Sequence, residues 1–179
     1  RWVQAEALRY VTSAIRYAAD KKAGIIIWMG NEPFPNAANT SLLEFDGCPK
    51  PAYYEVKKMF APIVLGLRHE SIVAKDGIVT VVPFMRADAR MLPLITDDVT
   101  LTAYDMSGTS IAQYALSAAD GNHDWDAIQL TVEKPLLVRL SSDALDICTE
   151  YVFLPENAHP FSSLLELAGC AVDISCAEN

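Results

Sequence analysis

The run Ile25-Ile26-Ile27-Trp28 restricts the fold of this chain more than any other stretch of the sequence. Every residue in it is large and apolar, whereas a strand with one face in water alternates apolar and polar side chains. Continuous apolar runs are typical of parallel α/β sheets, in which helices cover both faces of each strand. We therefore predict a buried strand at residues 25–28.

Two predicted helices flank this strand and complete about one repeat of a β/α architecture. In the first helix, apolar residues recur at helical spacing, and we expect them to form its buried face. These residues are Leu8, Val11, Ile15 and Ala18. A loop rich in Pro, Asn and Gly then covers residues 29–50. The second helix begins at Pro51, which suits the first helical position, and Pro62 ends it. Its predicted apolar face contains Tyr53, Val56 and Phe60.

The second part of the chain is predicted to be all-β. Asp76-Gly77 is a hairpin signal between residues 71–75 and 78–85. Further runs alternate apolar and polar side chains, beginning at Val99, Ile128, Leu136 and Tyr151, with a last strand at Ala168–Cys176. About seven or eight short strands at this spacing favour an antiparallel sandwich of the immunoglobulin-like kind.

The balance of charge changes at the same place as the predicted secondary structure. Residues 1–70 carry a net charge of +2 and residues 71–179 carry −11, which together give −9. We therefore predict an α/β part at residues 1–65 and a β-sandwich at residues 66–179. The acidic balance argues against nucleic acid as a partner, because phosphates require clustered Lys and Arg. No apolar run approaches the ~18 residues of a membrane span, so no membrane partner is expected.

The length of the chain argues against a complete barrel. A (β/α)8 barrel needs roughly 200 residues or more, and this chain has 179. Arg1 already lies within the first predicted helix, without an initiator Met or a signal-peptide pattern before it. We therefore expect the sequence to be an excerpt of a longer protein.

Neither a cofactor nor a metal site is predicted. The cysteines match no metal-ligand spacing and are interpreted as small apolar residues, with a disulfide as the alternative. They are Cys48, Cys148, Cys170 and Cys176. The histidines are isolated from one another, so surface or packing roles are expected for His69, His123 and His159. The compartment stays undetermined, because the triplet Asn39-Thr40-Ser41 acts as a glycosylation sequon only in a secreted protein.

The densest group of functional side chains follows the predicted strand, in the stretch from Trp28 to Pro35. Active sites of α/β proteins are assembled at the carboxyl ends of strands. A flat indole beside an amide and a carboxylate suits a sugar, whose C–H face stacks on Trp28 while its hydroxyls bond Asn31 and Glu32. The alternative is that Trp28 belongs to the core and Glu32 to a solvated loop.

Other acidic and aromatic residues are interpreted as structural. Phe45-Asp46-Gly47 is an ordinary turn, which accounts for Asp46 and for the neighbouring Glu44. A solvated loop around Gly121 accounts for a second polar cluster. This cluster contains Asp120, His123, Asp124 and Asp126. Trp2 and Trp125 are expected to be packing residues.

Five motifs follow one another in the first part of the chain. They are Gly24–Glu32, Asn39-Thr40-Ser41, Phe45-Asp46-Gly47, Lys50-Pro51-Ala52-Tyr53-Tyr54 and Phe60-Ala61-Pro62. In this order they resemble glycoside hydrolase family 2, and most closely its β-mannosidase-like members. In that family the motifs surround the eighth and last strand of a TIM barrel, and a C-terminal β-sandwich follows. The resemblance covers residues 1–65 closely and the remainder only by pattern.

This resemblance implies a retaining β-glycosidase that hydrolyses terminal β-linked sugars through a covalent glycosyl-enzyme. Mannose is the first choice of sugar, with galactose and glucosamine as alternatives. The family's acid/base and nucleophile carboxylates lie about 5 Å apart and come from the fourth and seventh barrel strands, which this sequence does not contain. We therefore expect no catalytic residue here and no activity of the fragment alone. The resemblance makes Trp28 the aromatic floor of the subsite for the cleaved sugar, and Asn31 and Glu32 its rim.

The pair Asn31-Glu32 also invites a catalytic interpretation, because the family's acid/base motif is an Asn-Glu pair after a Trp-containing strand. A Lys-Pro-Ala-Tyr helix and a sandwich come next here, whereas an acid/base position needs roughly half a barrel downstream. Glu32 is therefore assigned to substrate binding.

A non-catalytic carbohydrate-binding or structural sandwich module is the alternative function. A binding module needs exposed aromatic residues on one sheet face, and the candidates are Tyr104, Tyr114 and Trp125. A structural brace needs apolar contact between the helix at residues 51–61 and the sandwich. A lone strand at residues 25–28 exposes unpaired N–H and C=O groups. We therefore expect residues 1–63 to be covered by another copy, in a homo-oligomer, or to depart from barrel geometry.

Overall fold

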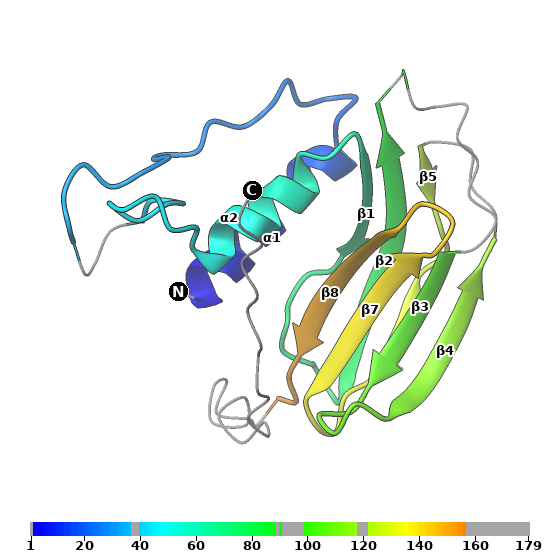
Figure 1. Ribbon diagram of the computed structural model, residues 1–179. Coiled ribbons are helices and arrows are strands. Elements are labelled where there is room, and N and C mark those ends of the chain that lie inside the picture. Colours follow the sequence, from blue (N-terminus) through cyan, green and yellow to red (C-terminus); the bar gives the residue numbers. More distant parts are fainter. Residues whose placement is uncertain (1, 37–39, 89, 91–98, 118–121, 157–179) are drawn as a thin grey trace.

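The computed structural model describes residues 2–36, 40–88, 90, 99–117 and 122–156. Two helices, α1 (Trp2–Tyr17) and α2 (Pro51–Met59), pack against each other. They lie on the β1 side of a β-sandwich, and the long segment between them runs away from the sheets (Figure 1). The predicted strand at Ala168–Cys176 lies outside the described residues, as do His159, Cys170 and Cys176.

In the described part of the chain, the sandwich consists of two antiparallel four-stranded sheets, as the alternating runs predicted. In the first sheet, β2 (Ile78–Ala87) pairs with β1 (Ile63–Arg68), β5 (His123–Asp124) and β6 (Ile128–Thr131). The second sheet has the order β4-β3-β7-β8. Its strands are β3 (Val99–Tyr104), β4 (Ser110–Leu116), β7 (Leu136–Ser142) and β8 (Ile147–Phe153).

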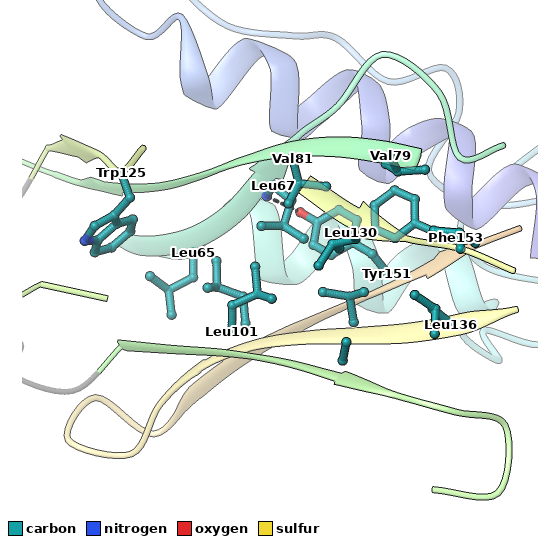
Figure 2. Close-up of a cluster of buried hydrophobic side chains, with 14 of the residues drawn as sticks. Leu65, Leu67, Val79, Val81, Leu101, Trp125, Leu130, Leu136, Tyr151 and Phe153 are labelled. Carbon is teal, nitrogen blue, oxygen red and sulfur yellow. Dashed lines mark hydrogen bonds between the residues drawn. The ribbon is translucent and has the colours of Figure 1, made fainter. Parts of the chain in front are cut away.

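The main hydrophobic core lies between these two sheets, where alternate residues of each strand point inward (Figure 2). Leu65 and Leu67 of β1 face Tyr151 and Phe153 of β8 across this core. The two strands are also joined by hydrogen bonds, because the backbone N–H of Leu67 donates to the Tyr151 hydroxyl at 2.9 Å. The hydroxyl of Thr149 donates to the carbonyl of Leu65 at 2.8 Å. This edge of the sandwich is therefore closed by side chains rather than by a backbone ladder.

The Asp76-Gly77 turn forms as predicted. Both residues have positive φ, 52° and 73°, as a two-residue hairpin turn requires. Lys75 and Ile78 exchange two backbone hydrogen bonds of 3.0 Å across it. The predicted strand at residues 71–75 is wrong, since Val73 forms only an isolated parallel bridge with Leu154. The strand that precedes β2 and pairs with it is β1, which the sequence pattern did not predict.

Helix α1 packs on the outer face of β1 and β2. Gly66 of β1 lies directly opposite Phe84 of β2, and a Cβ at Gly66 would lie 2.7 Å from Cε1 of the Phe84 ring. The absence of a side chain at Gly66 lets this ring lie flat over β1. Tyr17 then meets Phe84 edge to face, with 5.3 Å between the ring centroids.

The buried face of α1 is not the predicted one. The helix turns Ala5, Arg9, Thr12 and Ser13 inward, whereas Val11 of the predicted stripe is 43% exposed. Arg9 fixes this orientation: its guanidinium donates to the carbonyl of Glu150 and to the carboxylate of Glu6. It also lies 4.1 Å from the centroid of the Tyr151 ring. Polar contacts therefore decide which face of α1 meets the sandwich.

Helix α2 begins at Pro51, as predicted, and ends at Met59. Its buried residues are Ala52 and Met59, whereas Phe60 of the predicted apolar face is exposed. The helix that makes the main contact with the sandwich is α1, not the one at residues 51–61 that a brace was expected to use.

Candidate functional site

The segment Ile25–Trp28 lies in neither sheet, so the predicted buried strand is wrong in this structure. Ile26 is 96% exposed and Trp28 is 82% exposed. A strand buried on both faces needs neighbours in a sheet and helices above and below it. In the described part of the chain, the sheets are those of the sandwich. None of their strands pairs with residues 25–28. The TIM-barrel geometry expected for residues 1–65 is therefore not seen here.

The loop between the helices is nevertheless ordered by backbone hydrogen bonds. Leu43 donates to the carbonyl of Gly30 at 2.8 Å, and Glu32 donates to the carbonyl of Leu43 at 3.2 Å. Lys50 donates to the carbonyl of Leu42 at 2.9 Å. These bonds hold three stretches of the loop side by side, namely residues 29–32, 40–43 and 48–50.

A buried ion pair joins the three stretches. Glu32 is 3% exposed and Lys50 is 5% exposed, and their Oε1 and Nζ atoms are 2.5 Å apart. The fully buried hydroxyl of Ser41 accepts a hydrogen bond from Lys50 at 3.0 Å. The same hydroxyl lies 3.3 Å from Oε1 of Glu32 and 2.9 Å from the carbonyl of Leu43. Each buried charge therefore has the partner that burial in a low dielectric requires.

The hydrogen bond from Lys50 holds the pKa of Glu32 below its ordinary value of 4.5. Burial acts in the opposite direction, but the charge of Lys50 and hydrogen bonds from Ser41 and from the backbone of Asn36 outweigh it. Glu32 is thus an ionised carboxylate at neutral pH, and a proton donor is not available at this position.

The structure separates the three residues that the sequence assigned to substrate binding. Trp28 and Asn31 are exposed, and the Nδ2 atom of Asn31 is 3.4 Å from the carbonyl of Glu32. The carboxylate of Glu32 is instead buried in its ion pair with Lys50. Substrate binding by these three residues stays a prediction. Sequence reasoning did not assign Ser41 or Lys50 to the site, because nothing in their spacing indicates that they meet Glu32.

The remaining candidates are placed as follows. The Phe45-Asp46-Gly47 turn is confirmed: Gly47 has a φ of 85° and donates to the carbonyl of Glu44 at 2.9 Å. His123 and Asp124 form strand β5, and Asp124 pairs with Arg86 at 2.7 Å, so the solvated-loop interpretation is wrong for them. Asp120 lies outside the described residues.

The aromatic residues of the alternative function do not form an exposed row on the described strands. Trp125 is buried in the core, and its indole N–H donates to the carbonyl of Ser117 at 2.9 Å. This confirms the packing role predicted for Trp125. Tyr114 packs partly against the same core. The described strands of the sandwich therefore show no aromatic platform of the kind that a sugar-binding module needs.

Within residues 2–36, 40–88, 90, 99–117 and 122–156, no helix is long and apolar enough to span a membrane. The same residues hold no group of three or more His, Cys, Asp or Glu side chains placed to bind a metal ion. Cys48 and Cys148 are free and exposed thiols.

Comparison with known proteins relates this chain to solved structures only. No family model matches the sequence, and no curated protein matches it. The exo-chitosanase CsxA of Amycolatopsis orientalis, in complex with PNP-β-D-glucosamine, matches 84% of this chain at 17% identity with a TM-score of 0.55. A β-glucuronidase of Parabacteroides merdae matches 52% of this chain and 13% of its own length, at 14% identity with a TM-score of 0.37. This chain spans 18% of the exo-chitosanase. The likeness to the exo-chitosanase shows a shared fold.

Proposed function

We propose that this chain is the C-terminal part of a retaining β-glycosidase related to glycoside hydrolase family 2. Residues 1–65 are the last β/α unit of its catalytic barrel, and residues 66–179 are its terminal sandwich of the immunoglobulin-like kind. The parent enzyme hydrolyses terminal β-linked sugars in the manner of a β-mannosidase, with galactosides and glucosaminides as the alternatives.

The observation that carries this proposal is that the indole of Trp28 and the amide of Asn31, three residues apart in one loop, are both exposed. A large aromatic side chain is rarely left 82% exposed on a segment that a buried ion pair holds in place. The indole supplies the flat apolar surface on which a sugar ring stacks, and the amide supplies a donor and an acceptor for hydroxyls. The likeness in fold to an exo-chitosanase supports the same class of ligand.

The first part of the chain also distributes its polar and apolar residues as a piece of a larger domain would. Of the nine buried residues described between Trp2 and Pro62, six are polar or charged. The exposed residues of α1 are all apolar or aromatic: Val3, Ala7, Tyr10, Val11 and Ala14. A stable α/β unit has the opposite arrangement. The remaining strands and helices of a barrel would cover this face and pair with the segment at residues 25–28.

The proposed chemistry needs an acid/base carboxylate and a nucleophile carboxylate about 5 Å apart. Glu32, the one carboxylate in the candidate site with a catalytic interpretation, is held by Lys50 in the ionised form. We therefore propose that both catalytic carboxylates come from the parent enzyme and that this chain alone is inactive. In the parent, Trp28 would hold the sugar that is cleaved off.

Hydrolysis of p-nitrophenyl β-mannoside and β-glucosaminide tests the proposal. The purified chain is expected to release no nitrophenol, and turnover by it would contradict the assignment of the carboxylates. In the parent enzyme, expressed from the reading frame extended upstream of Arg1, Trp28→Ala should lower kcat/KM by about tenfold or more, equivalent to about 1.4 kcal/mol. Trp28→Phe should keep most of the activity.

Phe45→Ala is the matched control, because Phe45 is an exposed aromatic residue of the same loop that lies in a turn outside the ion pair. It should leave kcat/KM unchanged. An equal loss in both variants, or no loss in Trp28→Ala, would contradict the subsite assigned to Trp28.

A further inference from the structure

We infer that Glu32, Lys50 and Ser41 form a buried clasp that positions Trp28 and Asn31 for the ligand, and that Glu32 itself does not touch the ligand. This inference rests on the proposed function, since it takes Trp28 and Asn31 as the ligand-binding residues. It changes the role of Glu32 from a rim residue of the sugar subsite to a positioning residue.

The clasp connects parts of the loop that are far apart in the sequence. Glu32 and Ser41 are nine residues apart, and Glu32 and Lys50 are 18 residues apart. Each of the three stretches that the backbone bonds align contributes one side chain to the clasp. Because all three side chains are buried, the contacts are shielded from competition by water.

The clasp is tied to the ligand residues through the backbone. Leu42 donates to the carbonyl of Met29 at 3.1 Å, and Leu43 donates to the carbonyl of Gly30 at 2.8 Å. The acceptors, Met29 and Gly30, lie directly between Trp28 and Asn31 in the sequence, and the donors directly follow Ser41. Lys50 also occupies the N-cap position of α2. The position of Trp28 and Asn31 is therefore fixed relative to a helix.

Charge explains why Glu32 cannot serve the clasp and a ligand at once. Its Oε1 atom is engaged by the ammonium group of Lys50 and the hydroxyl of Ser41, and the backbone of Asn36 bonds the same carboxylate. Turning this carboxylate toward a sugar hydroxyl would break its ion pair with the buried ammonium group of Lys50, which is strongly unfavourable. The amide of Asn31, which is exposed, has no such cost.

The first test observes Trp28 directly by NMR of the indole N–H signals of the 179-residue chain. The signal of Trp28 is identified by its loss in Trp28→Phe. Glu32→Gln and Lys50→Met should each shift or broaden this signal, and the double variant should do so no more than either single one, because both changes remove the same contact. The indole signal of Trp125, in the sandwich core, should stay in place.

Glu133→Gln and Lys57→Met are the matched controls, because they make the same chemical changes at exposed positions. Both should leave the Trp28 signal unchanged. An unchanged Trp28 signal in Glu32→Gln and in Lys50→Met would overturn the inference, as would an additive effect in the double variant.

The pH dependence of the Trp28 signal tests whether Glu32 acts through its charge, because a residue that acted only through its shape would give no such dependence. In the wild type, the midpoint of the acid transition of the Trp28 signal should lie below pH 4.5, because the pKa of Glu32 is lowered from that value. In Lys50→Met, the lost ion pair leaves burial as the main influence, so the same transition should occur at higher pH. Identical transitions in both proteins would contradict the clasp.

The second test adds mannose or glucosamine and follows the same Trp28 signal. Equal losses of the sugar response in Glu32→Gln and Lys50→Met support positioning. A loss confined to Glu32→Gln, with the Trp28 signal still in place, overturns it and indicates direct contact between Glu32 and the sugar. If the wild type itself shows no response, the proposed sugar site fails in this chain, while the first test still decides whether the clasp positions Trp28.

Discussion

His69 is a buried imidazole at the junction of α1 and the sandwich. Its ring lies 5.4 Å from that of Tyr10, 5.8 Å from that of Tyr151 and 5.3 Å from that of Phe153, measured between centroids. Its Nδ1 atom has no hydrogen-bond partner in the described part of the chain. Burial, reinforced by the charge of Arg9, lowers the pKa of His69 from 6.5 to about 4.

This pKa predicts a pH dependence of folding stability. The unfolded chain binds a proton at His69 below pH 6.5, whereas the folded chain does so only near pH 4. The contribution of His69 is therefore fully present above pH 6.5 and is lost as the pH falls toward 4, by about 3 kcal/mol in all. His69→Phe should remove this part of the slope when urea unfolding is measured at several pH values. The same slope in both proteins would contradict the prediction.

Gly66 gives a second prediction at the scale of one residue. Its Cα faces the ring of Phe84, which is fully buried, so the ring would have to shift to accept a Cβ there. Gly66→Ala should therefore lower the free energy of unfolding by about 1–3 kcal/mol. Gly30→Ala is the control, since a Cβ there meets nothing within 4 Å. Chemical denaturation measures both, and the double variant Gly66→Ala/Phe84→Leu should recover part of the loss.

At the scale of the element, Arg86 of β2 caps the C-terminal end of α1. Its Nε and Nη2 atoms donate to the carbonyl of Tyr17 at 3.2 and 3.1 Å. Its Nη1 atom donates to the carbonyl of His123 at 3.0 Å and pairs with Asp124 at 2.7 Å. A guanidinium offers enough donors to satisfy all of these acceptors, and its positive charge suits a helix C-terminus. One side chain thus joins α1, β2 and β5.

Replacement of this arginine should loosen the end of the helix. Arg86→Met is expected to lower the free energy of unfolding by about 2–3 kcal/mol, because charged hydrogen bonds are lost and their partners stay partly buried. Hydrogen exchange at residues 14–22 should become faster. Arg139→Met is the control: Arg139 pairs with Glu150 on an exposed sheet face, so a loss below about 1 kcal/mol is expected. Equal losses in both variants would contradict the capping role.

The elements that the sequence predicted correctly are those specified by local chemistry. Pro51 begins α2 because its ring presets a helical φ, and Asp76-Gly77 turns because both residues tolerate positive φ. Alternation at β3 and β7 specifies strands, since period-2 spacing fits a sheet with a single buried face.

The predictions that were wrong depended on partners that local sequence does not specify. Ile25–Trp28 has the composition of a buried strand, but a strand forms only where another strand pairs with it. Val11 belongs to an apolar stripe at helical spacing, yet in the orientation that Arg9 sets through β8 it is exposed, and the rest of the stripe is only half-buried. The clasp was missed for the same reason, because nothing local indicates that Glu32 and Lys50 meet.

At the scale of the whole molecule, the two parts of the chain differ in how they bury apolar surface. The sandwich has a continuous core between its sheets (Figure 2). In the helices and their loop, Ala5, Ala52 and Met59 are the buried apolar residues of the described ranges. Burial of apolar area is the dominant favourable contribution to folding. The helical part therefore depends on surfaces outside itself, and the sandwich contacts it through Arg9, through Arg86 and through the ring pair of Tyr17 and Phe84.

Val11→Lys tests whether the exposed face of α1 is covered by the rest of a barrel in the proposed parent enzyme. In this chain Val11 is 43% exposed, so the substitution should change the free energy of unfolding by less than about 0.5 kcal/mol. In the proposed parent enzyme the same face would be buried, and an unpaired charge there should lower stability by about 2 kcal/mol or more. Ile111→Lys is the control, because Ile111 is 53% exposed on the sandwich strand β4 and should have a small effect in both proteins. Urea unfolding measures all four variants, and a small effect of Val11→Lys in the parent would mean that no barrel covers α1.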